Sequence, residues 1–160
     1  MAIQFVVEDG TGKSTATAYI TVAEFKQYWE NRGTTFTEAG SEIQAWINCA
    51  TEYLDSTYKF LGEAYSSTQA LQFPRINIID KRGETIESTS IPQDLKNACA
   101  YLAYQRKSGV LDKVGEDIAS ETYGPVSKTY KGSSLIVKYP LADKLLSGLI
   151  SSGCRLQRVN

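Results

Sequence analysis

The side chains that most enzymes use for acid–base and nucleophilic chemistry are scarce in this chain. Its 160 residues include no histidine, which excludes Ser-His and Cys-His nucleophile pairs and imidazole zinc ligands. The three cysteines, Cys49, Cys99 and Cys154, are far apart and match neither a disulfide framework nor a Cys-x-x-Cys metal site. We therefore expect a protein that is not an enzyme, that uses no cofactor or metal, and that works in a reducing compartment.

Residues 10–15 (GTGKST) resemble the end of a phosphate-binding loop, which uses a lysine ammonium and a hydroxyl to hold phosphate and magnesium. The complete motif needs a glycine five residues before Gly12, where this chain has Val7. The segment also leads towards Tyr19 and Ile20 instead of opening directly into a long amphipathic helix. We expect a solvated turn here.

Adjacent carboxylates at Glu8 and Asp9, and at Glu116 and Asp117, are the remaining groups suited to proton transfer or to binding a hard cation. Neighbours in sequence rarely converge on one point, and no glycine-punctuated loop of oxygen ligands surrounds either pair. We expect both pairs on a solvated surface.

Four helices are expected to form the framework. Capping boxes, in which a hydroxyl and a glutamate or glutamine side chain satisfy backbone donors at a helix start, occur at residues 21–24 and 41–44. Pro92 and Pro140 suit the first turn of two later helices. Apolar spacing of three and four residues then predicts the buried faces. The expected helices cover about residues 22–31, 41 to near 58–62, 92 to before 109, and 140 to about 149.

The apolar faces of these helices predict which residues form the core. The expected buried positions are Ile43, Ile47, Ala50 and Leu54 in the second helix, Leu95, Ala98, Cys99, Leu102 and Ala103 in the third, and Leu141, Leu145 and Leu149 in the last. Cys49 is also expected in the core, because buried cysteine behaves as a small hydrophobic residue. Cys154 is expected to be exposed.

Extended structure is expected in two places. Residues 76–80 and 84–87 indicate a short hairpin around Lys81-Arg82-Gly83, and residues 118–138 carry a second β-type pattern with turn residues at 131–134. The last ten residues, 151–160, are expected to be a flexible tail or one that a partner orders. The predicted fold is a single domain over residues 1–160, mainly α (α+β), a small helical bundle with a β-hairpin and extended terminal segments.

The near-neutral net charge of the chain argues against strong binding to nucleic acids. Seventeen Lys and Arg against eighteen Asp and Glu give a formal net charge of -1, which supplies no global positive field for a phosphate backbone. No run of 18 apolar residues occurs and the first residues are acidic, so neither membrane spanning nor secretion is expected.

Several segments together resemble the head–tail connector (adaptor) proteins of tailed bacteriophages and prophages, some of which carry the label DnaT-like single-stranded DNA-binding protein. Each motif is short, but they follow one another in the expected order over nearly the whole chain. They are residues 7–12 (VEDGTG), 18–24 (AYITVAE), 50–55 (ATEYLD), 69–75 (QALQFPR), 91–93 (IPQ), 124–126 (GPV) and 139–140 (YP).

The resemblance implies a ring of identical subunits, commonly twelve, below the portal at the capsid vertex. Such a ring extends the DNA channel without binding the DNA specifically, and joins the portal to a downstream neck or tail-completion protein. It implies assembly in the host cytoplasm and a final location in the neck of the virion. Near-neutral charge fits this role, because DNA must slide past the subunits.

Two surfaces are candidates for these protein interfaces. The tail could order on the portal or on a neighbouring subunit, and the loop around residues 120–134 could face the channel or the next ring. The candidate residues are Arg155, Leu156 and Arg158 in the tail, and Tyr123, Lys128, Tyr130 and Lys131 in the loop.

The alternative function is a replication accessory that binds single-stranded DNA, as the DnaT-like label suggests. That role needs a positively charged groove with aromatic side chains on which bases stack. The chain has ten tyrosines, but no run rich in lysine and arginine interleaves with them, so the connector role is the leading hypothesis.

Overall fold

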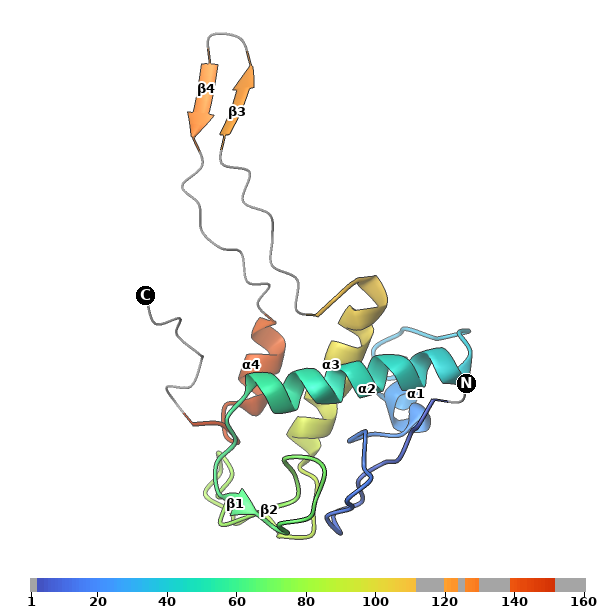
Figure 1. The fold of residues 1–160 in the computed structure, drawn as a ribbon, viewed down its shortest axis with the longest axis vertical. Helices are drawn as coiled ribbons and strands as arrows, with labels where there is room; N and C mark the ends of the chain where they lie inside the picture. Colours follow the sequence, from blue (N-terminus) through green and yellow to red (C-terminus); the bar gives the residue numbers. More distant parts are fainter. Residues whose placement is uncertain (1–2, 112–119, 124–125, 130–138, 152–160) are drawn as a thin grey trace.

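The computed structural model describes residues 3–111, 120–123, 126–129 and 139–151. Within these residues four helices and two small antiparallel sheets are present (Figure 1). The mainly α fold with a small β component is therefore confirmed. The elements are α1 (Val22–Glu30), α2 (Gly40–Thr57), β1 (Glu63–Ala64), β2 (Arg75–Ile76), α3 (Gln93–Ser108), β3 (Ser120–Tyr123), β4 (Val126–Thr129) and α4 (Pro140–Leu146).

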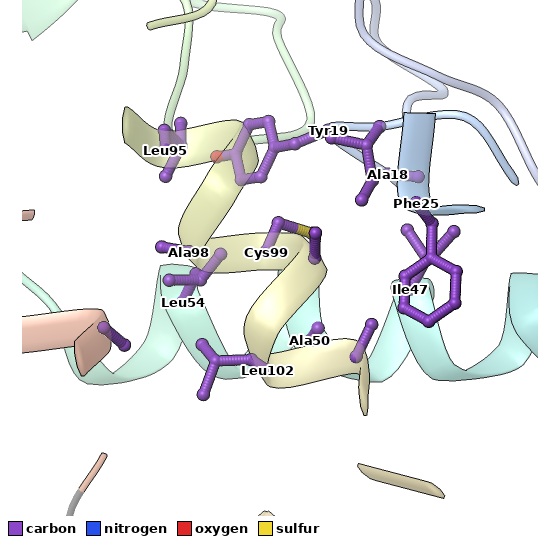
Figure 2. Packing of buried hydrophobic residues seen from close by; sticks show 14 of the residues in the cluster. Ala18, Tyr19, Phe25, Ile47, Ala50, Leu54, Leu95, Ala98, Cys99 and Leu102 are labelled. Carbon is purple, nitrogen blue, oxygen red and sulfur yellow. The ribbon is translucent and has the colours of Figure 1, made fainter. Parts of the chain in front are cut away.

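Helix α3 lies at the centre of the core, packed chiefly on α2 and also against α1 and α4. Its predicted buried face is confirmed, since Leu95, Ala98, Cys99, Leu102 and Ala103 are all fully buried. The small side chains at three of these positions let α2 come close to α3. Figure 2 shows side chains of α2, α3 and the segment before α1 meeting in this core.

The first helix begins as its sequence predicts. The Thr21 hydroxyl accepts a hydrogen bond from the Glu24 backbone N–H at 3.1 Å, and the Glu24 carboxylate accepts one from the Thr21 N–H at 2.7 Å. The capping box predicted at residues 41–44 is wrong. Helix α2 starts earlier, at Gly40, and its N-cap residue Ala39 has no side chain that could accept a hydrogen bond.

The hairpin predicted over residues 76–87 is present only in reduced form. Ile79 and Thr85 form one isolated bridge around the predicted turn, while Ile76 pairs with Glu63 in the β1–β2 sheet. Asn77 explains the change, because its φ of 60° interrupts the extended backbone that one continuous strand would need.

Helix α4 is rotated by one residue relative to the prediction. Ala142 and Leu146 are its fully buried residues, whereas Leu141 is 43% exposed and Leu145 only partly buried. Leu149 is buried as predicted but lies beyond the helix, where its carbonyl accepts a hydrogen bond from the Leu61 N–H at 2.8 Å. This contact joins the end of α4 to the segment that follows α2.

Candidate functional site

The hairpin formed by β3 and β4 contains two of the predicted interface residues. Its antiparallel register pairs Tyr123 with Val126 and Glu121 with Lys128. The β-type pattern predicted for this part of the chain is thus confirmed for the described strands. The other predicted interface residues lie outside the described residues: Tyr130, Lys131, Arg155, Leu156 and Arg158.

Several cationic side chains on the helical part of the molecule are engaged with carboxylates. Within the described residues five lysines and arginines form ion pairs, and the four whose distances are normal lie at 2.8 to 3.0 Å. Because each ammonium or guanidinium lies against a carboxylate, its local positive potential is largely cancelled. The pairs are Lys13–Asp9, Lys81–Asp94, Arg82–Asp80, Lys96–Glu24 and Lys107–Glu38.

Arg75 forms hydrogen bonds with carbonyl groups instead of an ion pair among the described residues. Its guanidinium donates hydrogen bonds to the backbone carbonyls of Leu61 and Gly62, both at 2.7 Å, and to the carbonyl and side chain of Gln72. Burial lowers the pKa of this guanidinium from its ordinary value. These hydrogen bonds join the segment that precedes β1 to the segment that precedes β2.

The large aromatic side chains of the helices belong to the core or pack against it. Trp29 and Tyr104 lie with their ring centroids 4.4 Å apart, and Phe25 and Phe36 lie at 4.9 Å. The Trp29 indole N–H also donates to the Ala100 carbonyl at 3.1 Å. These rings therefore offer little free face for stacking with nucleotide bases.

Glu8, predicted to be solvated, is buried with 2% of its surface exposed. One carboxylate oxygen accepts hydrogen bonds from the Gly10 and Gly12 N–H groups, both at 2.9 Å, and the other accepts from the Lys13 N–H at 2.8 Å. The backbone donors that a phosphate-binding loop would offer to phosphate are thus taken by the chain's own carboxylate. The prediction that this segment is not a phosphate-binding loop agrees with this geometry, although the reason was not foreseen.

A second internal carboxylate, Asp55, was also missed by the sequence reasoning. Its Oδ1 accepts a hydrogen bond from the Tyr19 hydroxyl at 2.5 Å, and its Oδ2 accepts one from the Gln72 N–H at 3.0 Å. The Tyr19 oxygen accepts in turn from the Phe73 N–H at 3.2 Å. Burial raises the pKa of Asp55 to about 6. This network joins α2 to two irregular segments. Its polar groups form hydrogen bonds with one another inside the fold.

The thiols and acidic groups of the described residues show no metal site. Cys99 is buried, and burial raises the pKa of its thiol to about 12, which disfavours the nucleophilic thiolate form. Cys49 is only half-buried, a partial correction of the predicted core position. No cluster of three potential ligands occurs among the described side chains. None of the described helices is long and apolar enough to cross a membrane.

The fold and these surfaces define a small, mainly α-helical protein with a separate β-hairpin. Residues 3–159 match the profile of the family described as "Putative DnaT-like ssDNA binding protein". Because the match covers nearly the whole chain, the chain belongs to this family. The DnaT-like label expected from the sequence is thereby confirmed, whereas the comparisons give no support for a phage connector. No curated protein and no solved structure matches the chain significantly.

Proposed function

We propose that the chain is a structural head–tail connector of a tailed bacteriophage, without catalytic activity. In this proposal its copies assemble in the host cytoplasm as a ring below the portal and remain in the neck of the virion. The ring extends the DNA channel and offers a surface to the next neck or tail-completion protein. The ordered motifs that resemble the connector proteins are the sequence support for this role.

One structural observation supports it most directly: five lysine and arginine side chains among the described residues of the helical part are paired with carboxylates. A protein that neutralises several phosphates with lysine and arginine binds DNA strongly at low salt. A channel subunit needs the opposite property, since tight binding would hold the DNA that must pass. The five ion pairs, together with Arg75 held by carbonyl groups, reduce the charge available to phosphates.

The second candidate is a replication accessory that binds single-stranded DNA, and the description of the family favours it. This function would require free cations beside exposed rings. Among the described residues Tyr65 is a large aromatic side chain with 44% of its surface exposed, and Gln69 and Ser66 lie in the same segment. This segment is the first place on the described surface to test for base stacking.

Two measurements on the purified full chain separate the candidates. The first mixes the chain with the portal protein encoded in the same genome and looks for a ring on the portal by electron microscopy. The second measures the fluorescence anisotropy of a labelled oligothymidine at low and at high salt. A ring with negligible oligonucleotide binding supports the connector. Micromolar binding that weakens steeply with salt, without a portal complex, would establish the alternative and overturn the proposal.

A variant and its matched control sharpen the second measurement. Tyr65→Ala removes the exposed ring, and Tyr104→Phe keeps a ring that already packs on Trp29 and Phe36. If the chain stacks bases, Tyr65→Ala weakens binding by about 1–3 kcal/mol per lost stack, and Tyr104→Phe leaves it unchanged. If the chain is a connector that does not bind DNA, we expect neither variant to change oligonucleotide binding or the formation of the portal complex.

A further inference from the structure

In the part of the chain that the structure describes, the β3–β4 hairpin makes no contact with a helix. Within the described residues its two strands contact each other, and neither contacts α1, α2, α3 or α4. Figure 1 shows the hairpin well apart from the helices. The hairpin is therefore not stabilised by packing against the described helices.

An isolated ribbon of two strands is at best marginally stable in water, and stability normally needs a third strand or a packed helix. The ladder between Ser120–Tyr123 and Val126–Thr129 uses only one edge of each strand. Among the described strands none pairs with the other edge of β3 or of β4, and the N–H and C=O groups of such an edge can pair with a further strand. Both edges of this hairpin are thus available for strand addition.

The charges of the two strands are opposite. Glu121 is the only charged residue of β3, Lys128 is the only charged residue of β4, and the two are register partners. A β3 edge placed beside the β4 edge of another copy can therefore bring a glutamate opposite a lysine. Pairing of two β3 edges would bring two glutamates into one strand pair, and pairing of two β4 edges would bring two lysines.

We propose that the β3 edge of one subunit pairs with the β4 edge of the next, so that neighbouring hairpins form one continuous antiparallel sheet. This inference rests on the proposed ring and names the surface that joins its subunits. The contact uses two different edges, and such heterologous contacts close into rings when the rotation between subunits is suitable. Repetition of the existing register places each Glu121 between Lys128 of its own hairpin and Lys128 of a neighbouring copy.

The test exchanges charges between copies. Glu121→Lys makes both strands of one variant positive, and Lys128→Glu makes both strands of the other negative. Each variant alone places like charges across every contact between copies, so we expect each contact to weaken by about fivefold. In an equimolar mixture the two variants can alternate, which restores opposite charges between copies while the pair inside each hairpin remains repulsive.

Mass photometry and sedimentation velocity over a concentration series provide the measurement. We expect the wild type to associate, each variant to associate less, and the mixture to approach the wild type. A second pair of variants, Glu52→Lys and Lys59→Glu, carries the same charge changes on exposed positions of the helical part. Mixing this control pair should give no comparable gain. Circular dichroism melting checks that the helices of every variant remain folded.

Three outcomes overturn the pairing of hairpins. They are a mixture that associates no better than its components, a gain equal to that of the control pair, and a wild type that stays monomeric up to its solubility limit. If the wild type still forms a ring on the portal in any of these cases, the connector role stands and another surface joins the subunits. If copies associate through the hairpins but form no complex with the portal, the connector role fails and the pairing remains.

Discussion

Replacing Asp55 with asparagine tests whether an internal carboxyl group gives this protein an unusual dependence of stability on pH. Burial raises the pKa of Asp55 from 3.8 to about 6, although the hydrogen bonds from Tyr19 and Gln72 and the charge of Arg75 act in the opposite direction. Asparagine has nearly the same shape but does not titrate. The comparison of the two proteins therefore isolates the effect of this proton.

The sign follows from the two pKa values. Between pH 6 and pH 4 the folded protein holds a proton on Asp55 that the unfolded chain has released, so acidification through this window stabilises the folded state. With values of about 6 and 3.8, the gain between pH 7 and pH 5 is about 1.3 kcal/mol, and it approaches about 3 kcal/mol below pH 4.

Other carboxylates do not obscure this window. The pKa of Asp9 is lowered chiefly by Lys13, that of Glu38 by Lys107, and that of Asp80 by the Glu84 backbone N–H. A lowered pKa gives stability that is present above the unfolded value and is lost as the pH falls through the folded value. Their unfolded values of 3.8 to 4.5 lie below the range from pH 7 to pH 5, so Asp55 dominates there.

Urea unfolding at pH 7, 6 and 5, followed by tryptophan fluorescence, measures the effect. We expect the free energy of unfolding of the wild type to rise relative to that of Asp55→Asn by about 1.3 kcal/mol between pH 7 and pH 5. Glu52→Gln, an exposed carboxylate on the same helix, should follow the wild type at each pH. A difference between wild type and Asp55→Asn that is constant with pH, or that reverses, would refute the reasoning.

Three further substitutions test the framework by urea unfolding at neutral pH. Glu8→Gln replaces one oxygen acceptor with an amide donor that faces backbone N–H groups, and we expect a loss of about 1–3 kcal/mol; a neutral result would contradict the burial of this carboxylate. Thr21→Ala removes the capping hydroxyl of α1 and should cost about 1 kcal/mol. Leu102→Ala opens a cavity in the centre of α3 and should cost about 2–5 kcal/mol; an effect below that of Thr21→Ala would argue against the central place of α3.

The parts of the fold that the sequence predicts well are those governed by local signals. The capping box at Thr21 and Glu24 needs only hydrogen bonds three residues apart, and the buried face of α3 needs only helical periodicity. In α4 the same reasoning is off by one residue. Its seven residues span about two turns, and contacts outside the helix, such as the one between Leu149 and Leu61, decide which face is buried.

The carboxylates that matter most inside the fold could not be assigned from sequence. Adjacent acidic residues usually lie on the surface, and the burial of Glu8 depends on glycines that let the backbone turn around it. Gly10 has a φ of 101°, and a Cβ atom there would lie 1.9 Å from the Thr89 carbonyl oxygen. The positions of these glycines were visible in the sequence, but their close approach to a distant segment was not.

The polar groups of the helical part are therefore used mainly to hold irregular segments in place. Glu8 closes the loop before α1, Asp55 joins α2 to the segment at Gln72, and Arg75 binds the carbonyls beside β1. A ligand could bind these side chains only if their hydrogen bonds within the fold were broken. The β3–β4 hairpin differs, because each of its strands has one unpaired edge and neither contacts a helix within the described residues. A binding function of this chain is accordingly sought first at the hairpin, where association with another strand adds hydrogen bonds and disrupts none.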